Sequence, residues 1–110
     1  MLFAKEVIEF VGKIPKNLAN NEIAKQLVRS AGSVGANYIE ANEALSKKDF
    51  LMRVKISRKE AKESCYWIKL LTVPDSLLAS QADLLQEGTE VMKIFSSIIE
   101  KSAPKSANSK

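Results

Sequence analysis

Histidine is absent from the 110 residues of the chain, and its absence removes a large part of enzyme chemistry. Histidine is the commonest metal ligand, the usual general base, and the only side chain whose unperturbed pKa lies near neutrality. Zinc sites of the usual kind and Ser-His-Asp or Cys-His nucleophile systems are therefore not expected. The sequence predicts no catalytic residue, no metal site and no cofactor.

Cysteine and long apolar runs are also scarce. Cys65 is the single cysteine, so no disulfide can form within the chain, and its apolar neighbours indicate a buried thiol in a reducing compartment. Lys5, Glu6 and Glu9 interrupt the segment where a signal peptide needs an unbroken apolar stretch. No later run reaches membrane-spanning length. We therefore expect a cytoplasmic protein without a membrane partner.

Charge is the first feature present in an unusual pattern. The net charge is only +4, but residues 46–72 hold eight basic and three acidic residues, whereas residues 73–100 hold one lysine and five acids. Residues 1–45 are balanced, with five residues of each sign. A surface built from residues 46–72 is therefore expected to be basic.

Helical spacing of apolar residues runs through the chain, and 45% hydrophobic content suits one domain of this length. The pattern predicts a first helix over residues 2–14, ended by Pro15, and a turn in which an asparagine of residues 17–21 caps a second helix running to about residue 44. Capping-box spacing predicts that the third helix begins at Ser46 and the fourth at Ser80, with Val73 and Pro74 between them.

Each of the three longer helices carries an apolar stripe, and no strand signal interrupts them. The stripes consist of Leu27, Ala31, Val34, Tyr38, Ala41 and Leu45; of Phe50, Val54, Ser57, Ala61, Ser64, Ile68 and Leu71; and of Leu84, Val91, Met92, Phe95, Ile98 and Ile99. Short connections favour antiparallel neighbours. The predicted fold is an all-α, antiparallel up-down four-helix bundle over residues 1–101, followed by a mobile tail over residues 102–110.

Two glycines in the second helix, Gly32 and Gly35, cost about 1 kcal/mol each relative to alanine at an ordinary exposed helical position. Close approach of a neighbouring helix is the favoured explanation, because no phosphate-loop pattern accompanies the glycines. A flexible anion site lined by backbone is the alternative.

A polar stripe runs beside the apolar stripe of the second helix. Its spacing of four, four and three residues places the four groups on one face. The polar stripe consists of Arg29, Ser33, Asn37 and Glu40. We interpret it as structural, either a hydrogen-bond network that sets helix register or a subunit contact. Catalysis is a poor alternative, because Glu40 has no nucleophile or second acid spaced to work with it.

The third helix carries two further surfaces. Its outward face is basic and is a candidate for binding nucleic-acid phosphates, with a tyrosine able to stack on a base. This basic face consists of Lys48, Lys55, Lys59, Lys62, Tyr66 and Lys69. The alternatives are a merely solvated face, or one complemented by the acidic fourth helix. A mixed flank, predicted as an oligomer interface, consists of Arg53, Ile56, Glu60, Glu63 and Trp67; a wide core stripe would also cover Ile56 and Trp67.

Several spaced blocks of the sequence together resemble a known family. The blocks are Gln26–Ser30, Ser33–Ala41, Ser46–Phe50, Lys59–Ser64 and Tyr66–Trp67. They resemble the bacterial four-helix bundle family that includes proteins encoded in 23S ribosomal RNA intervening sequences and, more distantly, the accessory variability proteins of diversity-generating retroelements. The resemblance implies an up-down protomer that assembles into a homopentamer and has no enzymatic activity; nucleic-acid binding is proposed for some members of the family.

Two functions are consistent with these features. The first is a homo-oligomeric accessory or scaffold protein that binds RNA or DNA through the basic face. The second is a protein-interaction module that uses the same face to bind an acidic protein partner and has no nucleic-acid role. Persistence of the partners after nuclease treatment would favour the second.

Overall fold

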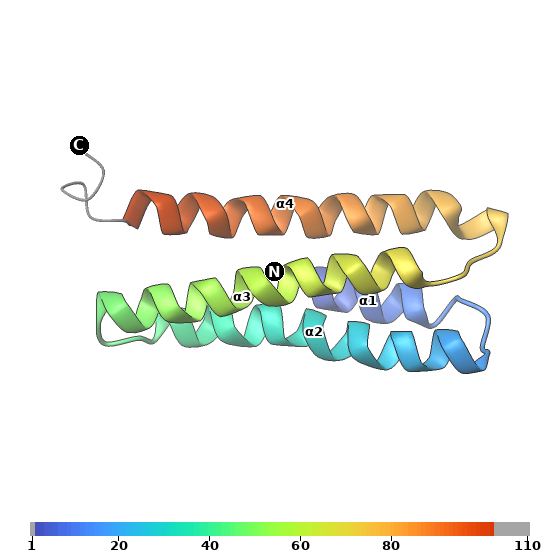
Figure 1. Cartoon of the computed structure of the whole chain (residues 1–110), viewed down its shortest axis with the longest axis horizontal. Helices are drawn as coiled ribbons and strands as arrows, with labels where there is room; N and C mark the ends of the chain where they lie inside the picture. Colours follow the sequence, from blue (N-terminus) through green and yellow to red (C-terminus); the bar gives the residue numbers. More distant parts are fainter. Residues whose placement is uncertain (1, 103–110) are drawn as a thin grey trace.

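The computed structural model describes residues 2–102, which form four α-helices and one short 3-10 turn (Figure 1). The elements are α1 (Phe3–Val11), α2 (Leu18–Asn42), α3 (Lys47–Leu70), η1 (Asp75–Leu77) and α4 (Leu78–Ser102). No strand occurs within these residues. Consecutive helices run in opposite directions along the long axis (Figure 1), which confirms the predicted all-α, up-down bundle. The proposed tail begins at the last residue of α4, and residues 103–110 lie outside the described part.

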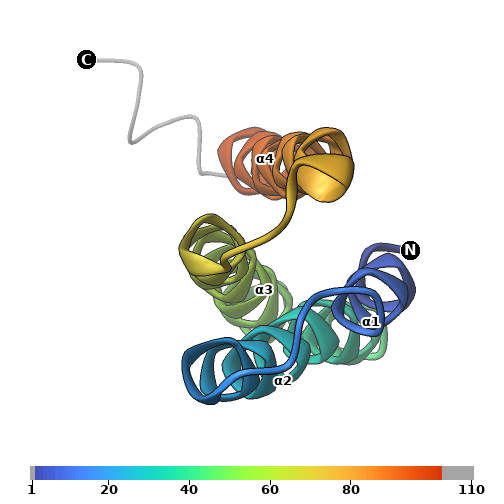
Figure 2. The ribbon, with the colours of Figure 1, turned by 90° about the vertical axis from the view of Figure 1, so that its right-hand side faces the viewer.

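The four helices pack in a ring in which each contacts its neighbours in sequence, and α1 closes the ring against α4 (Figure 2). With nine residues, α1 is far shorter than α2 or α4, which have 25 each. It therefore covers only one end of the bundle (Figure 1). None of the helices in residues 2–102 is both long and apolar enough to cross a membrane.

Asparagine and serine cap α2 and α3 as predicted, although α2 begins at Leu18, within the segment predicted as a turn through Asn21. Asn17 accepts a hydrogen bond from the backbone N–H of Asn20 at 2.8 Å, and Ser46 accepts one from the N–H of Asp49 at 3.1 Å. Asn20 itself is buried, and it joins the α1–α2 loop to the α3–α4 connection. Its Nδ2 donates to the carbonyls of Pro15 and Thr72, and its Oδ1 accepts from the N–H of Thr72.

The start of α4 and the end of α1 differ from prediction. The fourth helix begins at Leu78, directly after η1, so Ser80 lies inside the helix rather than at its cap. The first helix ends at Val11, although Ile14 is still buried in the following turn. Pro15 has no N–H to donate to the carbonyl of Val11 four residues upstream, and its ring would clash with that carbonyl if the helix continued.

Leu45 was predicted to belong to the core stripe of α2, and this is wrong. The helix ends at Asn42, so the spacing that places Ala41 inside no longer applies, and Leu45 is fully exposed in the α2–α3 connection. The stripe of α3 was predicted correctly. Phe50 is half-buried, and the other six members, including Ser57 and Ser64, are buried.

The contact between α2 and α3 depends on small polar side chains at core positions. Ser57 donates to the carbonyl of Val34 at 2.9 Å, and the hydroxyl oxygens of Ser30 and Ser64 lie 2.7 Å apart. All three serines are fully buried. Their small volume lets the two helices approach, and the hydrogen bonds satisfy groups that would otherwise be costly to bury.

Gly32 and Gly35 do not serve this contact. A Cβ atom added at either position would meet no atom within 4 Å apart from its own helix and chain neighbours. The packing interpretation of these glycines is therefore wrong within the chain. Close approach occurs instead at Gly88 of α4, where an added Cβ would lie 2.7 Å from the Cys65 sulfur and 3.4 Å from the Phe3 ring.

Candidate nucleic-acid interface

The basic face of α3 lies on the surface of the bundle. All six of its members are exposed, and Tyr66 retains 55% of its accessible area. Their position follows from the core, because burial of Val54, Ala61 and Ile68 fixes the rotation of α3 about its axis. The lysines from Lys55 to Lys69 then recur on one side at helical spacing.

The lysines of the basic face are not neutralised within the bundle. No ion pair in residues 2–102 involves Lys48, Lys55, Lys59, Lys62 or Lys69. The alternative in which acidic α4 complements these lysines by direct pairing therefore has no support in the described part of the chain. An unpaired row of cations remains available to an anionic partner.

A groove runs between α3 and α4 along one edge of the basic face. Its cavity volume is about 430 Å³. The α3–α4 groove is lined by Lys62, Cys65, Tyr66, Lys69, Leu85, Thr89 and Met92. Burial raises the pKa of the Cys65 thiol, which outweighs the opposing influence of Thr89 and Lys69. Burial therefore favours the neutral thiol over the thiolate, and Cys65 contributes apolar surface to the groove.

The sequence did not reveal that Arg58 and residues of α4 line a second recess beside the basic face. Farther along the same helix pair, a second recess is lined by Arg58, Lys93, Ser96, Ser97, Ile99 and Glu100. The guanidinium of Arg58 donates to the hydroxyl of Ser96 at 3.3 Å. These residues lie on two helices, and the periodicity of α3 alone does not identify them. The one sequence signal for Arg58 is its spacing of four residues from Lys62, which places the two side chains one turn apart on the same side of α3.

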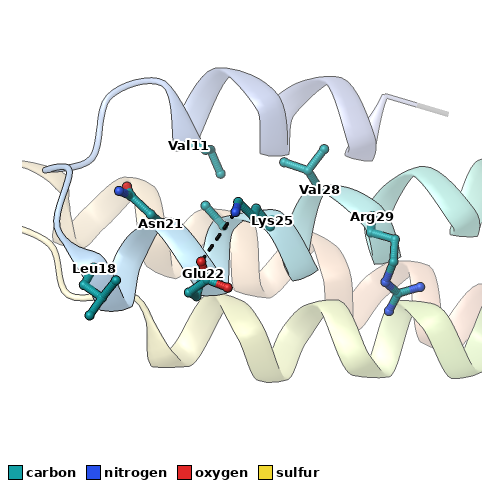
Figure 3. A pocket seen from close by; sticks show the side chains of 8 residues that line it. Val11, Leu18, Asn21, Glu22, Lys25, Val28 and Arg29 are labelled. Carbon is teal, nitrogen blue, oxygen red and sulfur yellow. Dashed lines mark hydrogen bonds and ion pairs between the residues drawn. The ribbon is translucent and has the colours of Figure 1, made fainter.

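Residues of the α2 polar stripe contact residues of the α3 mixed flank in two separate clusters. Arg29 pairs with Glu63 through its Nη2 and lies 3.6 Å from Glu60 through its Nη1. It extends from α2 toward α3 (Figure 3). The indole N–H of Trp67 donates to the same Glu63 oxygen at 3.3 Å. The two groups of residues, which the sequence presents as separate surfaces, thus meet inside one chain.

Glu60 is the buried member of the first cluster, with 8% of its area exposed. Within residues 2–102 its Oε1 has no hydrogen-bond partner, so the Arg29 guanidinium at 3.6 Å supplies charge compensation without a direct hydrogen bond. A buried carboxylate depends strongly on such a cation. Arg29 therefore holds two carboxylates of α3 against α2.

The second cluster lies nearer the α2–α3 connection. The amide of Asn37 donates to the carbonyl and hydroxyl oxygens of Ser33, and its Oδ1 accepts from Arg53 at 3.0 Å. Glu40 is exposed and lines a recess of about 330 Å³ together with Arg53 and Asp49. Ile56 is half-buried. The polar stripe thus includes a hydrogen-bond network that can set the register of α2 against α3.

Two further recesses lie beside α1. One, of about 700 Å³, is formed on α2 near the end of α1; Val11 and Val28 line it, and Lys25 pairs with Glu22 at 3.4 Å (Figure 3). The other lies between α1 and α4 and is lined mainly by acids and Lys13. The acids are Glu6, Glu9, Asp83 and Glu87. Within residues 2–102, no group of three or more acidic or cysteine side chains is placed to hold a metal ion.

The acidic corner perturbs one carboxyl group. A hydrogen bond with Glu6 raises the pKa of Glu87 to about 7, and burial and the negative charge of Glu6 act in the same direction. The α1–α4 contact is therefore most stable when the Glu6–Glu87 pair shares one proton. This corner has the opposite charge to the basic face.

Comparison with known proteins identifies the family. A family model described as "23S rRNA-intervening sequence protein" matches residues 1–97. The chain belongs to this family. A crystal structure of a protein of unknown function from the S23 ribosomal protein family of Bacteroides thetaiotaomicron VPI-5482 has 31% sequence identity to the chain and a TM-score of 0.67. The match covers 88% of the present chain and 97% of the relative.

No curated protein matches the chain. The descriptions of the intervening-sequence family and of the Bacteroides protein name no catalytic activity. The resemblance seen in the sequence blocks is thereby confirmed at the level of the family and the fold. The family name refers to the ribosomal RNA segment, and the relative's description states that its function is unknown.

Proposed function

We propose that the protein is a non-enzymatic, homo-oligomeric bundle that binds RNA or DNA through the basic face of α3 and acts as an accessory or scaffold protein. The observation that carries the proposal is the row of exposed, unpaired lysines from Lys48 to Lys69. Each lysine that contacts a phosphate releases counterions, which makes the affinity steeply dependent on salt.

The family resemblance leads us to propose a pentamer. Assembly would repeat the basic face and raise the local density of positive charge. The mixed flank of α3 is the proposed contact between protomers. Its charged members already have partners within the chain, so the half-buried Ile56 and Trp67 would supply the apolar contact. We propose a cytoplasmic location for the protein.

The decisive test replaces Lys55, Lys59 and Lys62 by glutamate and measures binding of a labelled RNA and a labelled DNA by fluorescence anisotropy at several salt concentrations. The affinity should fall at every salt concentration, and the slope of log affinity against log salt should become shallower by about 2–3. The matched control reverses Lys5, Lys16 and Lys25, which are exposed outside α3 and change the net charge equally.

The proposal fails if no binding is detected at low salt, or if the two triple variants weaken binding equally. In the latter case net charge, rather than the basic face, determines the affinity. Capture of an acidic protein that survives nuclease treatment, together with absence of nucleic-acid binding, would instead establish the protein-interaction module.

A further inference from the structure

The α3–α4 groove differs chemically from the rest of the basic face. Its apolar surface comes from Cys65, Leu85 and Met92, and none of its seven lining side chains in the described structure is acidic. Cys65 is buried, and Leu85 and Met92 are half-buried. Phosphates are strongly hydrated and gain nothing from an apolar surface, whereas the flat faces of unpaired bases do.

An aromatic ring stands at the edge of this groove. Tyr66 is 55% exposed, and its ring meets that of Trp67 at a centroid distance of 5.0 Å and an interplanar angle of 61°. Trp67 is held in turn by packing on the core and by its hydrogen bond to Glu63. Tyr66 is therefore supported by a fixed neighbour before any ligand arrives, which lowers the entropic cost of stacking.

Cations stand along the same helix pair at the spacing of helical turns. Lys62 and Lys69 line the groove, seven residues apart and thus about 10 Å along the axis of α3. Arg58 and Lys93 continue the row at the next recess, which Glu100 also lines, so the cations from Arg58 to Lys69 span 11 residues of α3, roughly 16 Å. This distance corresponds to several nucleotides of one strand at about 3.4 Å each.

From these three observations we infer that the α3–α4 groove binds unpaired bases, so that the protein selects single-stranded nucleic acid over duplex. A base stacks on Tyr66 above the apolar surface of Leu85 and Met92, while Lys62 and Lys69 contact the flanking phosphates. A duplex offers phosphates to the lysines but keeps its base faces inside the stack, so it engages only part of the site. The inference rests on the proposed nucleic-acid function and adds the form of nucleic acid and the residues that select it.

The test compares a labelled ten-nucleotide oligoadenylate RNA with a ten-base-pair RNA duplex at the same salt concentration, using wild-type protein, Tyr66→Ala and Tyr66→Phe. Wild type should bind the single strand more tightly. Tyr66→Ala should weaken single-strand binding roughly 5- to 150-fold, the range seen when a stacking aromatic is removed, and leave duplex binding within about twofold. Tyr66→Phe keeps the ring and should retain the wild-type preference.

Trp67 provides a second readout, because it is the single tryptophan of the chain and touches Tyr66. Its fluorescence should change on addition of the single strand and not of the duplex. Circular dichroism of Tyr66→Ala should match wild type, since the side chain is exposed.

The outcomes separate this inference from the proposal on which it rests. Equal binding of single strand and duplex, unaffected by Tyr66→Ala but lost in the Lys55, Lys59 and Lys62 reversal, overturns the inference and leaves the proposed function standing. Binding of neither RNA at low salt overturns both. Loss of duplex and single-strand binding together in Tyr66→Ala also overturns it, because the tyrosine would then not distinguish the two.

Discussion

At the scale of single residues, Arg29 joins features that the sequence presents apart. Its position on a polar stripe of α2 could be predicted from spacing alone. Its partners, Glu60 and Glu63, could not be predicted, because periodicity defines the faces of each helix but not which faces meet. The pairing with Glu63 and the buried Glu60 oxygen at 3.6 Å emerge only when α2 and α3 are packed.

Replacing Arg29 by alanine is expected to lower the free energy of unfolding by about 1–2 kcal/mol. The buried carboxylate of Glu60 then loses its cation, although the half-exposed position of Arg29 keeps the cost below that of a fully buried pair. Urea denaturation measures the change. Arg29→Lys, which retains a charge, should lose less, and an unchanged denaturation midpoint in Arg29→Ala would contradict the bridging role.

Glu87 should make stability depend on pH. Its pKa is raised to about 7 from an ordinary 4.5, so the folded protein binds this proton more tightly than the unfolded chain does. The resulting stabilisation is fully present below about pH 4.5 and is lost as the pH rises through 7.

Because other carboxyl groups also titrate, the measured quantity is the difference between Glu87→Gln and wild type. The free energy of unfolding of the variant, relative to wild type, should rise by about 0.2–1 kcal/mol between pH 5 and pH 8, a range set by solvent screening of this half-buried pair. Glu9, Lys13 and Asp83 line the same corner and are present in both proteins. A constant difference across this range would show that Glu6 and Glu87 do not share a proton.

At the scale of elements, the reliability of prediction followed the regularity of the pattern. The heptad of α3 predicted its buried row and, by exclusion, the exposed lysines. Prediction failed where an element ended, as at Leu45, where helical spacing was extended past the end of α2, and at Ser80, where a capping pattern occurs inside α4. Spacing alone does not distinguish a capping serine from one inside a helix.

Alanine substitutions can test whether the two glycines of α2 are free of close packing. Since a Cβ at Gly32 or Gly35 meets nothing within 4 Å, Gly32→Ala and Gly35→Ala should each raise the free energy of unfolding by about 0.5–1 kcal/mol. The matched control is Gly88→Ala, whose Cβ would lie 2.7 Å from the Cys65 sulfur. That variant should lose about 1–3 kcal/mol through overpacking.

Thermal and urea unfolding of the three variants check this prediction. Destabilisation by Gly32→Ala or Gly35→Ala would mean that this face of α2 is covered in the functional protein. In that case the glycines would serve close packing between chains, which a single protomer does not contain.

At the scale of the whole molecule, the bundle separates its charges. The basic face lies on α3, and the acidic corner lies between α1 and α4, on the other side of α4 from the α3–α4 groove. The uneven charge of residues 46–72 and 73–100 predicted this separation in outline. The groove itself could not be predicted, because it requires Leu85 and Met92 of α4 to lie beside Tyr66 of α3. The sequence does not show which residues of two different helices come into contact.

The most direct measurement of the proposed function is multi-angle light scattering on protein purified at low salt, with absorbance recorded at 260 and 280 nm. We expect a mass that is a multiple of the 12.2 kDa protomer. We also expect absorbance at 260 nm that nuclease treatment removes from wild type and that is absent from the variant with Lys55, Lys59 and Lys62 replaced by glutamate. A 12.2 kDa particle free of nucleic acid would contradict the proposed function.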